Sequence, residues 1–160
     1  CGVTQEHIRH VARTFRGLPH RLQVVRVVDG VTYIDDSFST VPETAIAAIE
    51  SFPQPIVLIL GGSEKGSDFS ELGFAVAKKS VKAAIVVGVM SERIVAALKN
   101  GGYANKIIMG FRSMQEIVKV SRQEAKPGDV VLLSPACASF DMFKNYKERG
   151  EKFTYEVSHL

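Results

Sequence analysis

Short runs that are apolar at every position are the feature that most constrains the fold of this chain. Four such runs occur in the sequence, at residues 56–60, 83–87, 107–109 and 130–133. A strand with one solvated face alternates apolar and polar residues, whereas a strand covered on both faces is apolar throughout. Segments with helical patterns lie between or after these runs, at residues 68–79, 91–100, 113–125 and 142–157. This alternation predicts an α/β fold with a doubly wound, mostly parallel sheet that binds ligands at the carboxyl ends of its strands.

A hairpin is expected ahead of the parallel strands. Residues 22–28 and 31–34 are rich in β-branched side chains and flank Asp29-Gly30, a dipeptide typical of a two-residue hairpin turn. The sheet should therefore be Rossmann-like with an antiparallel hairpin at its N-terminal side.

A short polar helix is expected before the hairpin, at residues 4–15, with Thr4 as its cap. Its apolar side chains fall on one stripe, at Ile8, Val11 and Phe15. The chain begins with Cys1 rather than methionine, and this helix is too polar to belong to a core. We therefore expect the chain to be a piece of a longer protein.

The composition gives expectations about which kinds of binding partner this chain has. The net charge is +3 over 160 residues, with basic residues spread among acidic ones, so we expect no nucleic-acid partner. The two cysteines form neither a disulfide framework nor a metal-ligand pattern, and we expect a reducing cytoplasm. No run of about 18 apolar residues is present, so we expect no membrane association.

The first loop expected at the carboxyl edge of the sheet is Asp35-Asp36-Ser37-Phe38-Ser39-Thr40. Its carboxylates suit ribose hydroxyls or a metal-bound phosphate, and its hydroxyls suit an anion at a helix N-terminus. Thr40 and Glu43 also match a capping box, in which Thr40 would cap the following helix and the aspartates would be solvated. Both readings remain open from the sequence.

The second loop, residues 61–68, places Lys65 among glycines whose backbone can approach a ligand closely. It is not a Walker A loop. That motif has a glycine, then four residues, and then Gly-Lys-Ser or Gly-Lys-Thr, and this loop does not contain it. Loops at strand ends often carry binding sites, but a plain connector is an equally good interpretation here.

The third loop begins at Ser134 and runs to Asp141, ahead of the last expected helix. Its serines and backbone N–H groups could bind a carboxylate near a helix N-terminus. Cys137 lies among Ala, Pro and Leu without a histidine nearby in sequence, so we interpret it as a buried structural residue rather than a nucleophile.

Four segments taken together resemble the Mur ligase family. They are residues 17–21 (GLPHR), Asp36-Ser37-x-x-Thr40, Gly61-Gly62-x-x-Lys65-x-x-Asp68-Phe69 and residues 132–153 (LLSPACASFDMFKNYKERGEKF). The resemblance covers about residues 17–155, and the last segment is its most specific part. It is closest to the branch that joins D-glutamate to UDP-N-acetylmuramoyl-L-alanine. It implies that residues 1–17 are the tail of a central ATP-binding domain and that residues 18–160 form the C-terminal, amino-acid-binding domain.

The resemblance also implies the chemistry and the site. Family members activate a carboxylate with ATP and Mg²⁺ as an acyl phosphate. The amino group of glutamate then attacks it and phosphate leaves, and the protein mainly positions the reactants and neutralises charge. The Mg²⁺ ligands and the ATP-cradling loop would lie in the central domain. The implied amino-acid-binding residues are Thr40, Lys65, Ser139, Phe140 and Tyr146. The implied nucleotide-binding residues are Arg21 at the phosphate and Asp36 at the ribose.

Phe38 departs from the family pattern, which has a lysine at this position. A phenylalanine side chain does not form an ion pair with a carboxylate, so the substrate is in doubt. One alternative is a variant ligase that adds L-glutamate, whose loop resembles Ser37-Phe38-Ser39-Thr40-Val41-Pro42. A second alternative is a binding domain with no catalytic role, because a fold by itself does not fix a function.

Overall fold

The structure is a computed structural model that describes residues 2–15, 17–63 and 66–160, and its central element is a six-stranded sheet. The strands are β1 (Gln23–Val28), β2 (Val31–Asp35), β3 (Ile56–Gly61), β4 (Val81–Val87), β5 (Lys106–Ile108) and β6 (Val130–Leu133). Their order in the sheet is β1-β2-β6-β3-β4-β5. Only the β1–β2 pair is antiparallel among these strands, and the other four pairings are parallel. The expected hairpin and the expected doubly wound sheet are both confirmed.

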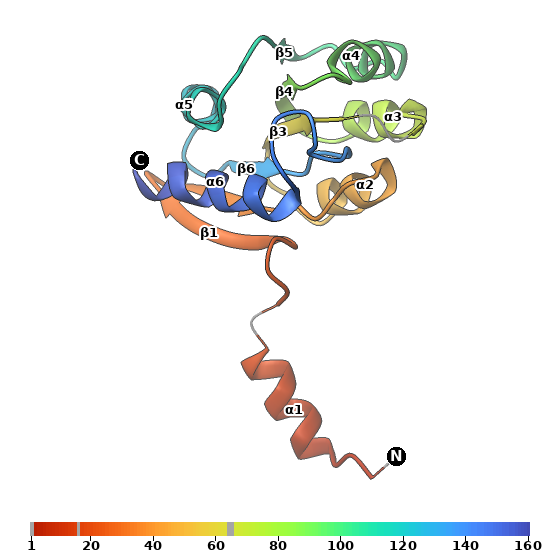
Figure 1. Ribbon diagram of the computed structural model, residues 1–160. Helices are drawn as coiled ribbons and strands as arrows, with labels where there is room; N and C mark the ends of the chain where they lie inside the picture. Colours follow the sequence, from red (N-terminus) through yellow and green to blue (C-terminus); the bar gives the residue numbers. More distant parts are fainter. Residues whose placement is uncertain (1, 16, 64–65) are drawn as a thin grey trace.

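Helices cover both faces of the sheet (Figure 1). They are α1 (Gln5–Thr14), α2 (Pro42–Glu50), α3 (Ser70–Lys78), α4 (Ser91–Asn100), α5 (Met114–Glu124) and α6 (Tyr146–Ser158). One core cluster joins the sheet to α2, α3 and α4 through residues such as Ile49, Leu72 and Leu98. The other joins it to α5 and α6 through residues such as Ile117 and Phe153. Covering both faces explains why the inner strands are apolar at every position.

The chain order places β6 between β2 and β3. The strands β3, β4 and β5 follow one another outward in one direction, and the chain then returns through α5 to the middle of the sheet. The carboxyl ends of β2, β6 and β3 therefore lie side by side, at the place where the direction of the strand order reverses. Doubly wound sheets bind their ligands at such a switch point.

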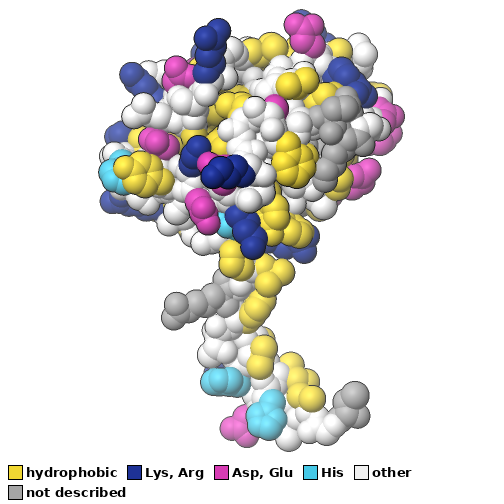
Figure 2. Space-filling view, in the orientation of Figure 1, with side chains coloured by type: hydrophobic (Ala, Val, Ile, Leu, Met, Phe, Trp, Pro, Cys, Tyr) yellow, Lys and Arg dark blue, Asp and Glu magenta, His cyan; other side chains and the backbone are white. Residues whose placement is uncertain are grey.

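Helix α1 projects away from the rest of the domain (Figure 1). None of its residues is buried, and the expected apolar stripe faces outward, with Ile8 58%, Val11 58% and the following Phe15 65% exposed. Figure 2 shows apolar side chains along this helix and along the segment that leads to the domain. The Thr4 cap is confirmed, since its Oγ1 accepts a hydrogen bond from His7 N at 3.3 Å. No helix of the described residues is long and apolar enough to cross a membrane.

Two expected helix starts are wrong. Thr40 does not cap α2, because the helix begins at Pro42 and Val41 occupies the cap position without a side-chain hydrogen bond. Proline is favoured in the first turn, since its φ is already helical and its missing N–H would have no partner there. The last helix begins at Tyr146 rather than at residue 142, because the Asn145 side chain accepts a hydrogen bond from Glu148 N at 3.0 Å.

Candidate functional site at the carboxyl edge of the sheet

The three loops singled out in the sequence meet at the carboxyl edge of the sheet. Backbone hydrogen bonds tie them together: Asp36 N donates to Leu133 O at 2.9 Å, and Gly61 N donates to Pro135 O at 2.8 Å. Ser63 N donates to Ala138 O at 2.8 Å, which forms an isolated antiparallel bridge between the second and third loops. The loops after β2, β3 and β6 therefore form one continuous surface.

Glycine is required where the second loop passes under the third. Gly62 has φ +145°, and a Cβ built on it would lie 2.0 Å from Ala138 O. Gly61 has φ +114°, and its Cβ would lie 1.9 Å from Val87 O. A side chain at Gly62 would separate the second loop from the third, and one at Gly61 would push β3 away from β4, so both glycines allow close backbone approach.

Four of the five implied amino-acid-binding residues line one pocket of about 240 Å³, which we name the hydroxyl pocket. Its lining comprises Phe38, Thr40, Ala138, Ser139, Phe140, Asn145 and Tyr146. Lys65, the fifth, lies outside the described residues. The neighbouring Ser63 accepts a hydrogen bond from Phe140 N at 3.2 Å, so the second loop borders this pocket. Three side chains with a hydroxyl and one with an amide line the pocket together with aromatic rings, which suits a small polar ligand.

The two implied nucleotide-binding residues, Arg21 and Asp36, line a separate cavity of about 160 Å³ next to α2. Asp36 is only 3% exposed. Its Oδ1 accepts a hydrogen bond from Leu22 N at 3.1 Å, and its Oδ2 accepts one from Ser134 Oγ at 2.8 Å. Of the two readings left open from the sequence, the one with solvated aspartates is wrong on this point, since Asp35 is also fully buried. Asp36 joins the first loop to the third and to the segment before β1.

Burial raises the pKa of Asp36, because the charged carboxylate loses its hydration, and the nearby Asp35 adds to the effect. The folded state therefore takes up a proton at a higher pH than the unfolded chain, whose carboxyl has the ordinary pKa of 3.8. Between these two pKa values the folded state binds more protons, so this group contributes more stability as the pH falls.

Asp36→Asn should remove this contribution. We expect the unfolding free energy of wild type to rise relative to that of the variant as the pH falls from neutral towards 3.8. Urea titrations at a series of pH values measure this difference. Asp68→Asn is a matched control with the opposite sign, because hydrogen bonds from Ser70 lower the pKa of Asp68. Parallel pH profiles for wild type and Asp36→Asn would contradict this assignment.

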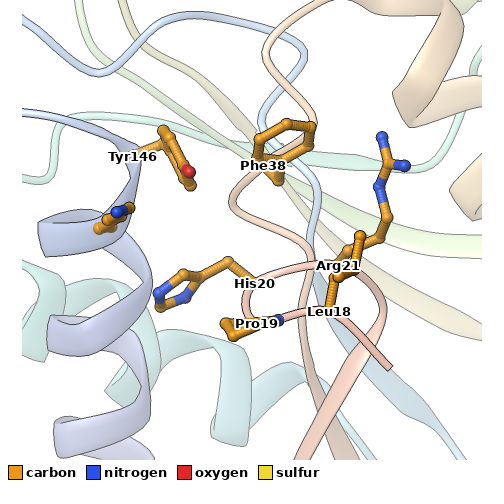
Figure 3. A pocket seen from close by; sticks show the side chains of 7 residues that line it. Leu18, Pro19, His20, Arg21, Phe38 and Tyr146 are labelled. Carbon is orange, nitrogen blue, oxygen red and sulfur yellow. The ribbon is translucent and has the colours of Figure 1, made fainter. Parts of the chain in front are cut away.

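A third pocket, larger than these two, has a volume of about 380 Å³ and shares Phe38 and Tyr146 with the hydroxyl pocket. We name it the aromatic pocket, and it is lined by Leu18, Pro19, His20, Arg21, Phe38, Tyr146 and Lys147 (Figure 3). The Phe38 and Tyr146 rings meet edge to face, with centroids 5.0 Å apart. Because both rings also line the hydroxyl pocket, they form a shared wall between the two pockets.

Arg149 is the most important residue of this region that the sequence analysis did not assign. Arg149 belongs to α6, and its side chain is buried. It donates hydrogen bonds to the first loop, from Nε to Ser37 Oγ at 2.9 Å and from Nη2 to Ser37 O at 2.9 Å. Its Nη1 donates to Cys137 O at 3.1 Å and lies 3.4 Å from Ala138 O. Burial lowers the pKa of Arg149 to about 10, so the guanidinium stays charged at neutral pH. Arg149 thus holds the first and third loops against each other.

The sequence did contain a signal for this role. Position 149 lies next to Gly150 and four residues before Phe153, on the buried side of α6. A charged residue on the buried side of a helix needs hydrogen-bonding partners inside the protein. The interpretation of Cys137 as a buried residue is confirmed, since it is 2% exposed.

The segment before β1 is held in a strained turn beside the first loop. His20 and Leu22 have φ values of 60° and 44°, in the left-handed region that only a few non-glycine residues adopt. His20 Nδ1 lies 2.8 Å from Asp35 Oδ2, and His20 O accepts a hydrogen bond from Phe38 N at 2.9 Å. Gly150 leaves space for this pair, because a Cβ there would lie 2.3 Å from His20 Nδ1. These contacts hold the turn in a strained conformation that it would not keep alone.

The similarity to known proteins agrees with this geometry. Residues 20–137 match the family described as Mur ligase, glutamate ligase domain. A UDP-N-acetylmuramoylalanine-D-glutamate ligase of Pelotomaculum thermopropionicum is 47% identical over 160 residues, which cover 99% of this chain and 34% of that protein. The chain spans about a third of the length of the curated relatives it matches.

Two solved structures share the fold. The UDP-N-acetylmuramate-alanine ligase MurC of Thermotoga maritima has a TM-score of 0.68 and 16% identity over 99% of this chain and 34% of that one. The MurF ligase of the same organism, solved in complex with ADP, has a TM-score of 0.58 and 22% identity over 91% of this chain and 33% of that one. The family match spans most of the chain, and the fold agrees with it. The chain therefore belongs to the Mur ligase family and carries its glutamate ligase domain.

Proposed function

We propose that this chain is the C-terminal, glutamate-binding domain of an ATP-dependent ligase that adds D-glutamate to UDP-N-acetylmuramoyl-L-alanine. The observation that carries the proposal is the meeting of Thr40, Ser139, Phe140 and Tyr146 around the hydroxyl pocket. These residues come from two loops about a hundred positions apart and from the first turn of α6, and the family resemblance assigns all four to the amino acid. The name of the relative from Pelotomaculum thermopropionicum supports D-glutamate as the amino acid.

The hydroxyl pocket would hold glutamate through its carboxylates. The hydroxyls of Thr40 and Ser139 and the N–H groups near Phe140 and Tyr146 can donate hydrogen bonds to a carboxylate, and Lys65 would add a positive charge. The role of the domain is then to orient the attacking amino group towards an acyl phosphate and to neutralise the charges of both ligands.

The nucleotide would be shared with a central domain. Arg21 would contact its phosphates and Asp36 its ribose, beside the hydroxyl pocket. Residues 1–17 would be the tail of that central domain, which fits the solvent-facing stripe of α1. In residues 2–15, 17–63 and 66–160 no group of three or more His, Cys, Asp or Glu side chains could hold a metal ion. The family resemblance places the Mg²⁺ ligands of the proposed enzyme mainly in the central domain. Such an enzyme would act in the cytoplasm, where its ATP is found.

The proposal is tested by amide chemical-shift titration of the 160-residue chain with D-glutamate and, separately, with L-glutamate. We expect D-glutamate at millimolar concentration to shift the amides of Thr40, Ser139 and Tyr146. Selective shifts with L-glutamate would instead support the variant ligase, an alternative that Phe38 in the pocket wall keeps open.

The Lys65→Ala variant tests how much the positive charge contributes to this binding. We expect the same residues to shift, but at higher glutamate concentrations, because a charged partner of the carboxylate is removed. Shifts that occur only outside the hydroxyl pocket, with either enantiomer, would remove glutamate as the ligand and leave a binding domain of another specificity.

A further inference from the structure

The aromatic pocket is not explained by the roles assigned so far, apart from Arg21. Its walls come from three segments: residues 18–21, the loop after β2 and the first turn of α6. Apolar surface is supplied by Leu18, Pro19, Phe38 and Tyr146 (Figure 3). Figure 2 shows apolar and basic side chains next to one another where the N-terminal segment meets the domain. A ligand for this pocket would need an apolar or flat part beside its polar group.

The charged lining of the aromatic pocket is entirely basic. Arg21 and Lys147 line it together with His20, and no Asp or Glu is among its lining residues. Two acidic residues adjoin the lining. Asp35 Oδ2 lies 2.8 Å from His20 Nδ1. Glu148 follows Lys147 in the sequence, and its Oε1 lies 3.1 Å from Lys152 Nζ while its Oε2 accepts a hydrogen bond from Lys144 N at 2.6 Å. Glu148 is thus engaged with residues outside the pocket.

Arg21 is held in position by the shared aromatic wall. Its guanidinium carbon lies 4.8 Å from the centroid of the Phe38 ring, within the range of a cation–π contact. Phe38 is in turn held by Tyr146 and by the hydrogen bond from Phe38 N to His20 O. A stacked guanidinium keeps its N–H groups available at its edges, where they can bind carboxylate or phosphate oxygens.

Lys147 is the second cation that lines the pocket. It is the second residue of α6, a helix of 13 residues whose N-terminal end carries partial positive charge. Two cations, Arg21 and Lys147, therefore line one pocket, next to the N-terminus of α6. Without an anion between them, such like charges repel each other.

We propose that the aromatic pocket is an anion-binding subsite in which Lys147, together with Arg21 stacked on Phe38, binds the negatively charged group of a ligand. Lys147 is the residue that this assignment adds. A carboxylate or a phosphate fits the same chemistry. If the proposed function holds, the carboxylate would be one end of glutamate reaching past Tyr146, and the phosphate would belong to the nucleotide. The subsite itself depends only on the pocket.

The test uses two probes, inorganic phosphate and glutarate, titrated into the 160-residue chain while amide chemical shifts are recorded. We expect shifts at Arg21, Phe38 and Lys147 in the millimolar range that weaken when sodium chloride is added. Lys147→Gln should weaken the binding by about fivefold, since one partly exposed charge is lost. Tighter binding of phosphate would assign the subsite to a phosphate group, and tighter binding of glutarate would assign it to a carboxylate.

Lys119→Gln is the matched control, because Lys119 is an exposed lysine on α5 that lines no part of the pocket. Equal weakening in both variants would mean that only the net charge matters, and this would overturn the subsite. So would unchanged shifts at Arg21, Phe38 and Lys147 with both probes. If D-glutamate then still shifted the hydroxyl pocket, the proposed function would stand without the subsite. Binding of phosphate to the aromatic pocket without any response to glutamate would leave the subsite and remove the proposed function.

Discussion

Arg149→Leu should destabilise the chain by about 3–5 kcal/mol, the usual cost of removing one partner from a buried, charged hydrogen-bond network. The variant removes the donor to Ser37 O and the guanidinium contacts with Cys137 O and Ala138 O, of which Ala138 O keeps its hydrogen bond from Ser63 N. Each buried acceptor without a donor costs about 1–3 kcal/mol, and leucine offers none. Urea titration of wild type and variant at neutral pH measures the difference.

Two further variants separate the charge of Arg149 from its geometry. Arg149→Lys keeps the charge but not the planar group that reaches three backbone and side-chain partners at once, so it should recover only part of the loss. Arg9→Leu, on the exposed helix α1, should change the unfolding free energy by no more than about 0.5 kcal/mol. A loss below about 1 kcal/mol for Arg149→Leu would show that the buried hydrogen bonds of Arg149 contribute little to the unfolding free energy, and this would contradict the prediction.

Gly62→Ala is expected to have a comparably large effect, on the order of 3 kcal/mol or more, for a different reason. The new Cβ would lie 2.0 Å from Ala138 O and 3.1 Å from Cys137 Cβ, so the second and third loops would have to move apart. That movement breaks the bridge between Ser63 and Ala138 and opens the hydroxyl pocket. Thermal unfolding would report the stability, and D-glutamate titration would report the pocket.

Gly102→Ala is the matched control for this variant. Gly102 also has a positive φ, of +88°, but no atom lies within 4 Å of its hypothetical Cβ. This control should therefore show only the backbone cost, about 1–2 kcal/mol. Equal losses for the two variants would mean that the close approach of the loops contributes nothing.

The sequence predicted the fold well because its signals are local. The apolar runs that became β3, β4, β5 and β6 and the Asp-Gly turn of the hairpin each extend over a few residues. The capping box at Thr40 was misleading because a competing local signal, Pro42, sets the start of α2. Strands, turns and helix starts are set by residues that are neighbours in the sequence, so periodicity and turn chemistry can predict them.

The candidate site was predictable only as a set of loops. Ser37 and Arg149 are 112 positions apart, and Asp36 and Ser134 are 98 positions apart, so no pattern along the chain shows that they touch. The family resemblance supplied the residues of the hydroxyl pocket. It did not supply the aromatic pocket, which exists because the turn at His20, the ring of Phe38 and the first turn of α6 come together in space.

The two aspartates at the end of β2 point to opposite faces of the sheet. Asp35 holds His20 near α6, whereas Asp36 holds Ser134 and Leu22 on the side of α2. Since side chains alternate along a strand, adding or deleting one residue in β2 would exchange the two carboxylates and disconnect both attachments at once. The length of this strand is therefore more restricted than its composition. Anyone grafting the domain onto another protein, or redesigning its hairpin, can vary the exposed side chains of β1 but must preserve the residue count from the turn at Gly30 to Ser37.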